Sequence, residues 1–394
     1  MFIPSLPTLN PLHLLPSLGS SRPALFPLDR LDDPAAQRFY LARAGVYHTM
    51  RHWLCAPGEK IAQSNNTVLM PAYHHGVEVE AVRAAGANIV FYRVDADMRI
   101  DLDDIARKAA QPGVRVVYVT HFVGFAQPIA EVRKIAQAHN LRLFEDCALA
   151  LFSRSPEGVP LGSLGDASCY CLYKTLPVPH GGLLLAPDVP RATVTTPPLL
   201  STLHHVAGLI LTHLELHSAG LGGAIRAAAR ATSQATVDKA VTTVQTGTMH
   251  IAEHDLDLGA SRWVAPILAR TDTEMVVARR RHNFSRLATA LDGVLPVVGA
   301  PLLPGVCPLF LPVRIDSTRC NGLDKPMIMQ RLHAVGIDAI DFWDSGDPLC
   351  DPHEFPEVTQ LRHEILELPC HQSLDDDDID QVAHAMKQIL RNGR

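Results

Sequence analysis

Short apolar runs that read as strands alternate with segments of helical spacing between residues 66 and 185. The run RVVYVT at 115–120 is rich in β-branched residues and predicts a buried strand. Residues 129–139 follow it with their apolar side chains along one helical face. This alternation is typical of βαβ units around a mostly parallel sheet. It therefore predicts an α/β fold, in which ligands bind beyond the carboxyl ends of the strands.

Polar side chains follow several of these predicted strands, so one site is expected at their carboxyl ends. The residues at these ends are Tyr73, His74, His75, His121, Asp146 and Lys174. Asp146 and Lys174 are the residue types that pyridoxal 5'-phosphate (PLP) chemistry requires. A lysine holds the cofactor aldehyde as a Schiff base, and a carboxylate keeps the pyridine nitrogen protonated, so that the ring acts as an electron sink. The alternative for His74 and His75 is that they only cap the end of a strand.

Three motifs surround this pair in a fixed order. They are ED-x-A at 145–148, GSLGDAS at 162–168 and K-x-L-x-x-x-x-GG at 174–182. Together they resemble the DegT/DnrJ/EryC1/StrS family of PLP-dependent aminotransferases. The resemblance covers roughly residues 40–190 and 255–390, where an L-P-x-H-x-x-L motif at 368–374 adds to it.

The resemblance implies fold type I of the PLP-dependent transferases, with a homodimer whose site lies at a two-fold interface. We expect an N-terminal arm (1–37), a large α/β domain with a mostly parallel sheet (38–245) and a small C-terminal α+β domain (246–394). The implied reaction moves an amino group from an amino acid, commonly glutamate, to a keto-sugar that is commonly linked to a nucleotide. The lysine argues against the branch of the family that has a histidine there and performs dehydration.

The resemblance also implies roles for individual residues. Lys174 holds the cofactor and carries a proton between the substrate α-carbon and C4′, and Asp146 pairs with the ring nitrogen. His75 takes the place of the aromatic ring that covers the cofactor. Gly45 and Val46, at the expected start of a helix, frame the phosphate through backbone N–H groups. The alternative for this segment is a helix start that only acts as a flexible hinge.

Three positions depart from the family's pattern. Val46 replaces a threonine, Cys169 replaces a serine that binds the phosphate, and Leu149 replaces a glutamine that contacts the cofactor's phenolic oxygen. Each change removes a side-chain hydrogen bond, which keeps two alternatives open. One is a relative with altered PLP chemistry, such as elimination or decarboxylation. The other is a non-catalytic scaffold or sensor with the same fold.

Composition narrows the class of protein. The 394 residues are 47% hydrophobic and 19% charged, as in an ordinary globular enzyme, and the formal net charge of −6 argues against a general nucleic-acid binder. Eight scattered cysteines without a C-x-x-C motif favour a reduced, cytoplasmic setting. No stretch is apolar enough to span a bilayer. The first thirty residues are punctuated by prolines and predict an extended arm rather than a signal peptide.

Several charged groups are interpreted as structural. His213 and His217 stand four residues apart, which suits a metal, but no third ligand is evident, so surface or interface histidines are expected and no metal. The apolar helix that carries them is a candidate for dimer contact or for a membrane surface. The arginines at 279–281 predict a solvated helix end rather than a substrate clamp. The acidic run at 375–378 predicts a helix N-terminus rather than a metal site.

Overall fold

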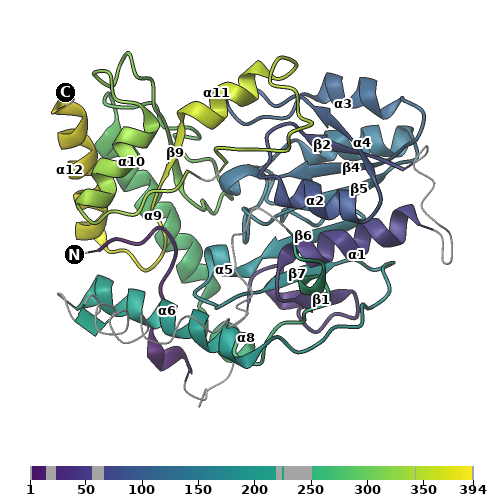
Figure 1. The fold of residues 1–394 in the computed structure, drawn as a ribbon, viewed down its shortest axis with the longest axis horizontal. Coiled ribbons are helices and arrows are strands. Elements are labelled where there is room, and N and C mark those ends of the chain that lie inside the picture. The colour runs from purple at the N-terminus through teal and green to yellow at the C-terminus, as the bar shows by residue number, and fades with distance from the viewer. Residues whose placement is uncertain are drawn as a thin grey trace.

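The computed structural model describes residues 2–14, 24–55, 66–218, 224–225, 251–341 and 343–392. Within these residues, a large domain is built on a seven-stranded sheet and a smaller domain contains a two-stranded sheet (Figure 1). The predicted α/β fold with a mostly parallel sheet is confirmed. The expected boundary between residues 245 and 246 lies outside the described residues.

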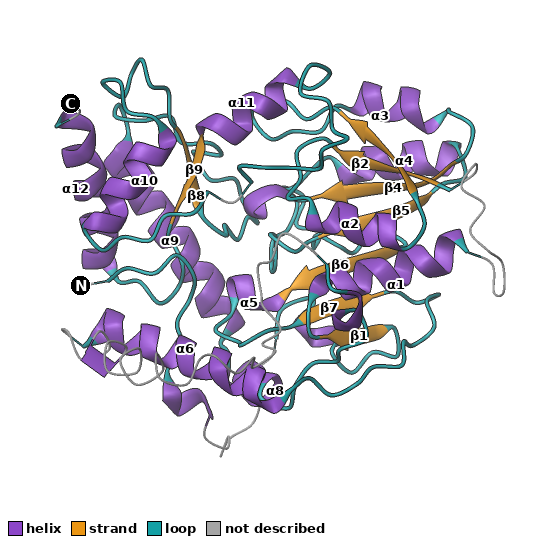
Figure 2. Cartoon of the chain, in the orientation of Figure 1, coloured by secondary structure: helices purple, strands orange, loops and turns teal. Residues whose placement is uncertain are grey.

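The large sheet has the strand order β1-β7-β6-β5-β4-β2-β3. Strands β2 to β6 pair in parallel, whereas β7 runs antiparallel to both β6 and β1. The strands are β1 (Ala36–Phe39), β2 (Thr67–Pro71), β3 (Asn88–Tyr92), β4 (Val114–Thr120), β5 (Arg142–Asp146), β6 (Ala167–Cys171) and β7 (Gly182–Leu185). The parallel strands end at one edge of the sheet, and β4, β5 and β6 are adjacent there (Figure 2).

Helices cover both faces of this sheet. The helices of the large domain are α1 (Ala42–Leu54), α2 (Val77–Ala84), α3 (Leu102–Ala109), α4 (Ile129–Ala138), the short α5 (Leu172–Thr175), α6 (Leu199–His217) and α8 (Val264–Arg270). Helices α1 and α2 pack against each other, and α3 packs against α4. Because parallel crossovers are right-handed, the reversal of direction after β3 puts these two pairs on opposite faces.

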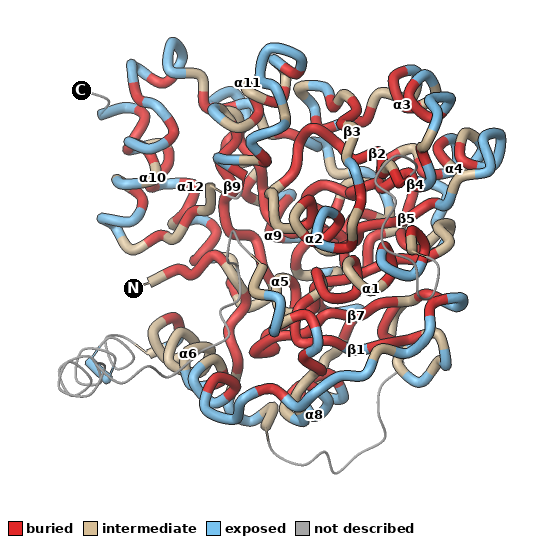
Figure 3. The backbone as a smooth tube through the Cα atoms, turned by 45° about the vertical axis from the view of Figure 1, so that its right-hand side comes forward, coloured by how far each residue is buried: buried red, intermediate tan, exposed pale blue. Residues whose placement is uncertain are grey.

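The smaller domain packs α10 (Lys325–Ala334) and α12 (Asp376–Arg391) with β8 (Leu311–Arg314) and β9 (Ile365–Leu368) around its own apolar core. Helix α11 (Pro356–Glu364) precedes β9, and α9 (Thr273–Leu291) links the two domains. The backbone is buried along the central strands of the large sheet (Figure 3). The N-terminal segment joins the smaller core, because Ile3 is fully buried there and forms a parallel bridge with Ile337.

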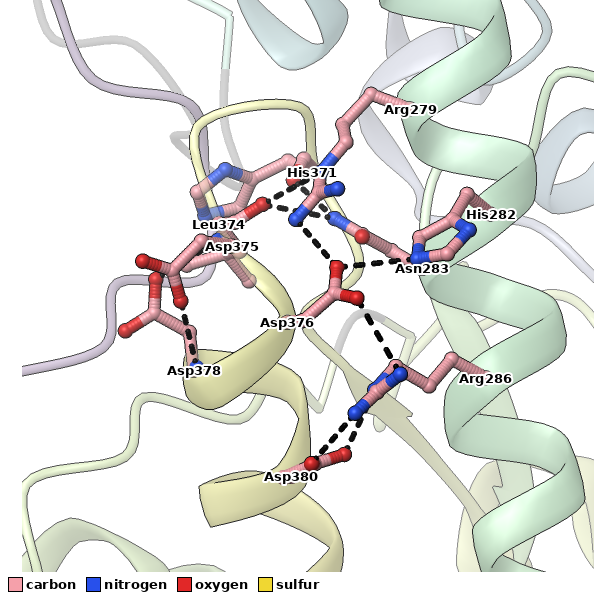
Figure 4. Close-up of polar contacts among 10 residues, drawn as sticks. All are labelled: Arg279, His282, Asn283, Arg286, His371, Leu374, Asp375, Asp376, Asp378 and Asp380. Carbon is pink, nitrogen blue, oxygen red and sulfur yellow. Dashed lines mark hydrogen bonds and ion pairs between the residues drawn. The ribbon is translucent and has the colours of Figure 1, made fainter.

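The acidic run at 375–378 begins helix α12, as predicted. Asp375 and Asp378 form a capping box, in which each side chain accepts a backbone N–H from the other residue. Asp376 then joins α12 to α9 through an ion pair with Arg279 at 2.9 Å and a second one with Arg286 at 3.3 Å (Figure 4). The run is therefore a helix cap that also holds the two helices together.

The arginines at 279–281 are not a solvated helix end, so that prediction was wrong. Helix α9 continues to Leu291, and Arg280 is fully buried in its middle. The Arg280 guanidinium donates to the carbonyl oxygens of Thr175, Pro308 and Leu309 and to the side chain of Gln372. Arg280 therefore ties the chain that follows Lys174 to the smaller domain.

Helix α6 carries His213 and His217, whose rings lie 4.4 Å apart. His213 shares a hydrogen bond with the hydroxyl of Thr8, so this face of α6 is covered by the N-terminal segment. The rest of the predicted helical region, to residue 231, lies mostly outside the described residues. Across the described ranges, no helix combines the length and the apolar character needed to cross a membrane.

Candidate active site

A cavity of about 410 Å³ lies at the carboxyl ends of β4, β5 and β6, between the start of α1 and four residues of the smaller domain: Ile340, Asp341, Trp343 and Asp344. Six of the seven predicted site residues line it: Val46, His75, Asp146, Leu149, Cys169 and Lys174. The structure does not bring Gly45 to this cavity, nor Tyr73 and His121 from the wider set of strand-end residues. The two residues that PLP chemistry requires thus share one enclosure.

Asp146 is the last residue of β5 and is 5% exposed. Its Oδ2 accepts the hydroxyl of Tyr118 at 2.7 Å, and its Oδ1 accepts the backbone N–H of Ala148 at 2.8 Å. The thiol of Cys169 also lies 3.6 Å from Oδ1. Burial and the nearby carboxylate of Glu78 raise the pKa of Asp146, although these hydrogen bonds oppose the shift. A cationic nitrogen in the cavity would therefore meet a carboxylate that the protein has already oriented.

Lys174 lies in α5, directly after β6, and its side chain is partly buried. Its positive charge acts on Asp146, where it lowers the pKa, and on His75, where it also lowers the pKa. The carbonyl of the next residue, Thr175, accepts hydrogen bonds from Arg280 and Gln372. The segment that carries the lysine is therefore fixed from the side of the smaller domain.

The double glycine of the K-x-L-x-x-x-x-GG motif brings β7 against the start of α1. A Cβ atom on Gly182 would lie 2.5 Å from the backbone nitrogen of Ala42, so only glycine permits this approach. Helix α1 begins at Ala42, earlier than the sequence predicted, and Gly45 is inside the helix. A Cβ on Gly45 would lie 3.1 Å from Leu184, so this glycine serves helix packing on β7. The helix terminus that faces the cavity carries Arg43 instead.

His75 lies just before helix α2, and its backbone N–H donates to Glu78 at 2.9 Å. Burial, followed by the charges of Lys174 and Arg43, lowers its pKa to about 4, so the ring is neutral near pH 7. His74 is fully buried and faces the protein, where Asp347 donates its backbone N–H to the His74 ring. Of the two histidines, only His75 lines the cavity.

Arg362 of helix α11 fixes this histidine segment. It donates to the carbonyl oxygens of Ala72 and His74 in the large domain and to those of Trp343 and Ser345 in the smaller one. The two domains are thus joined on both sides of the cavity, by Arg280 near Lys174 and by Arg362 near His75.

Glu145 explains the GSLGDAS motif. It is fully buried on the face of β5 opposite Asp146, and it accepts the backbone N–H groups of Gly162, Leu164 and Gly165. His121 completes this network, because its Nδ1 accepts a backbone N–H from Gln127 and its Nε2 then donates to Glu145. Within the described ranges, His121, Glu145 and Cys147 are the one group spaced to hold a metal. Their hydrogen bonds already occupy the histidine and the carboxylate.

Sequence reasoning missed several residues that line the cavity. They are Arg43, Glu78, Thr120, Asp341, Trp343 and Asp344. A signal existed for Thr120, which is the last residue of the predicted strand at 115–120. The other five depend on helix phase or on the approach of the smaller domain, which the local sequence does not specify.

The fold is that of PLP-dependent transferases of fold type I. The chain matches Helicobacter pylori PseC, an aminotransferase involved in the biosynthesis of pseudoaminic acid, with a TM-score of 0.67 at 15% identity, covering 99% of each chain. Residues 49–195 match the DegT/DnrJ/EryC1/StrS aminotransferase family. This segment of the chain is similar to that family.

Relatives share only part of their length with the chain. GDP-perosamine synthase of Vibrio cholerae is 27% identical over 122 residues, which are 30% of this chain and 33% of that protein. Glycine dehydrogenase (decarboxylating) of Paraburkholderia phytofirmans is 31% identical over 124 residues, 30% of this chain and 12% of that protein. Each match therefore spans about a third or less of the relative's own length.

Proposed function

We propose that the protein is a PLP-dependent aminotransferase that moves an amino group from an amino acid, commonly glutamate, to the ketone of a sugar that is commonly nucleotide-linked. The observation that carries this proposal is that Lys174 and Asp146 line one cavity and that the charge of Lys174 lowers the pKa of Asp146. The family match over residues 49–195 and the relatives that act on sugars support the same reaction class.

The residues around the cavity fit the cofactor. Its ring nitrogen needs a carboxylate, and Asp146 is held by Tyr118 on Oδ2 and by Ala148 on Oδ1, which leaves Oδ2 able to accept a second donor. Its phosphate needs an anion site, and the first turn of α1 offers backbone N–H groups together with the Arg43 guanidinium. Val46 and Cys169 border the same region, with an apolar side chain and a thiol where the family has hydroxyls.

When bound, PLP supplies the electron sink for carbanion chemistry. Lys174 would hold the cofactor aldehyde through its Nζ atom and, when free, would carry a proton to and from the substrate α-carbon. Asp146 Oδ2 would keep the ring nitrogen protonated, and the neutral ring of His75 would cover one face of the cofactor. Trp343 and Asp344 of the smaller domain line the same cavity.

The yellow absorbance of the protein with bound PLP tests the proposal. We expect purified protein incubated with PLP to turn yellow, and glutamate to discharge the colour with formation of 2-oxoglutarate. Lys174→Ala should remove the yellow band, whereas Lys134→Ala, on the outer side of α4 and away from the cavity, should retain it. Wild-type protein that takes up no PLP would contradict the proposal and favour the scaffold or sensor.

Light scattering tests the expected homodimer, and cell fractionation tests the expected cytoplasmic location.

The second candidate is altered PLP chemistry. The similarity to a decarboxylating glycine dehydrogenase favours it, as do the side chains of Val46, Leu149 and Cys169, which depart from the family's pattern. It predicts a yellow protein that glutamate does not bleach, with release of carbon dioxide from a donor amino acid. A half-reaction screen of the PLP form against amino acids separates the two candidates.

A further inference from the structure

Thr120 has a buried hydroxyl and is one of the residues that line the cavity. It is the last residue of β4, is 1% exposed and lines the cavity. Within the residues that the structure describes, its Oγ1 makes no hydrogen bond. An unpaired buried hydroxyl costs free energy, so one on a residue that lines a cavity is a candidate to bind a ligand or a water.

The strand pairing places Thr120 on one particular side of Asp146. Asp146 pairs with Thr120 across β4 and β5, and with Cys169 across β5 and β6. Helix α1, whose first turn carries Arg43, packs on β6 and β7. The carboxylate of Asp146 therefore has the anion site on its β6 side and the Thr120 hydroxyl on its β4 side.

The substitution pattern of the cofactor matches this arrangement. In PLP the phosphate arm at C5 and the phenolic oxygen at C3 lie on opposite sides of the axis from the ring nitrogen to C4. If Asp146 holds the nitrogen and the α1 terminus holds the phosphate, the phenolic oxygen is directed to the β4 side. Leu149, where the family has a glutamine for that oxygen, offers only an apolar side chain and is 4% exposed within the large-domain core.

We propose that Thr120 is a positioning residue whose Oγ1–H donates a hydrogen bond to the phenolic oxygen of PLP, the role that the family gives to a glutamine at the position of Leu149. This inference rests on the proposed function, because it requires that PLP binds. No covalent bond forms or breaks in this step. The hydroxyl donates and the phenolate accepts, so Thr120 stabilises the deprotonated form of the chromophore.

The first test compares Thr120→Val with wild type in the protein without cofactor. Valine has the shape of threonine without the hydroxyl, so removal of an unpaired group should leave the urea midpoint unchanged or raise it. A clear fall of the midpoint would mean that the hydroxyl already has a partner, such as an ordered water, and would overturn the proposal.

The second test measures PLP binding by absorbance titration. We expect Thr120→Val to raise the Kd by about tenfold or more, as for a hydrogen bond to a charged acceptor, and to raise the pH midpoint of the yellow band. Thr120→Ser should restore both values. The control Thr202→Val, at an equally buried threonine of α6 outside the cavity, should change neither.

An analogue without the C3 oxygen, 3-deoxypyridoxal 5'-phosphate, completes the test. Wild type and Thr120→Val should bind it with equal affinity, because the acceptor is missing. An equal reduction in affinity for PLP and for the analogue would overturn the role of Thr120 while leaving the proposed function intact. Failure of wild type to bind PLP would overturn both, and the wild-type titration alone shows which case applies.

Discussion

Glu145 and Asp146 are neighbours in strand β5 and are both buried, but they lie on opposite faces of the large sheet. Glu145 accepts three backbone N–H groups of the loop at 162–165 and the ring N–H of His121. Asp146 accepts Tyr118 on one oxygen and Ala148 on the other, and it borders the cavity. One sequence dipeptide thus contains a structural acid and a candidate functional acid.

The difference lies in how much hydrogen-bonding capacity the protein itself uses. An ionised carboxylate offers about four acceptor positions. Glu145 meets four donors within the described residues, so its negative charge serves to hold a loop. Asp146 retains capacity on Oδ2, and burial raises its pKa. Burial of an acid therefore indicates function only when its acceptor positions are incomplete and a cavity lies beside it.

Asp146→Asn should give the largest effect, a strong loss of activity with little change in stability. The amide cannot carry the charge that keeps the cofactor nitrogen protonated, so we expect kcat/KM for amino transfer to fall by about 10³-fold, or about 4 kcal/mol. The asparagine oxygen can still accept the N–H of Ala148 while its NH₂ group donates to the Tyr118 hydroxyl, which can also act as an acceptor, so the free energy of unfolding should change by less than about 1 kcal/mol. Transfer assays and urea unfolding measure the two effects. Equal losses in both would mean that Asp146 is structural, like Glu145.

Glu145→Gln should show the opposite pattern. The amide retains one acceptor oxygen and turns an NH₂ group toward backbone donors, so buried N–H groups of the 162–165 loop lose their partners. We expect a loss of about 3 kcal/mol in the free energy of unfolding. The folded fraction should bind PLP as wild type does. Glu131→Gln, at an exposed position of α4, is the control and should change stability by about 0.5 kcal/mol or less. A stable Glu145→Gln with weak PLP binding would reverse the assignment of the two faces.

The sequence predicted the fold and the gathering of His75, Asp146 and Lys174, because topology brings the ends of parallel strands together. The choice of Asp146 over Glu145 came from the family resemblance, because strand alternation alone does not decide which of the two acids faces the cavity. Period-two alternation requires opposite faces but does not say which face α1 and α2 will cover. The answer depends on crossovers that involve the whole domain.

Other failures have local causes. Strand β1 is short and contains Gln37 and Arg38, so neither the strand nor the early start of α1 was predicted. Arg280 was assigned to solvent because it lies in a run of three arginines. Its spacing of four residues from Val276 and from Phe284, both buried, puts it on the apolar face of α9 and could have identified it as buried.

The pH dependence of stability tests whether the His75 ring on the cavity side is buried with a lowered pKa. Its pKa in the folded protein, about 4, lies below the ordinary value of 6.5, so the unfolded chain takes up the proton first. The contribution is fully present above pH 6.5 and is lost as the pH falls toward 4. We expect the free energy of unfolding of wild type without cofactor to fall more steeply with decreasing pH than that of His75→Phe. The difference in slope should reach up to about 1.4 kcal/mol per pH unit, because unfolding of wild type takes up as much as one more proton. Parallel urea-midpoint curves between about pH 6 and pH 5 would show that the ring is not buried in this way.

Leu149→Gln should give the smallest effect. It returns a hydrogen-bonding amide to the cavity wall on the face of Asp146, so it should strengthen PLP binding by about 1 kcal/mol or less in wild type, where Thr120 is proposed to serve the same oxygen. In a Thr120→Val background the gain should be larger, because the proposed donor to the phenolic oxygen is then absent. PLP titration of the four combinations measures this coupling.

Leu143→Gln is the matched control for Leu149→Gln, because Leu143 is fully buried and points to the same face of β5 as Glu145. A buried amide there should cost stability without any gain in cofactor affinity, since that face is already saturated with protein hydrogen bonds. If both glutamines improved binding equally, acceptor capacity would not distinguish the two faces. If Leu149→Gln gained the same affinity with and without Thr120, the two side chains would serve different atoms, and the β4 side of the site would need another ligand group.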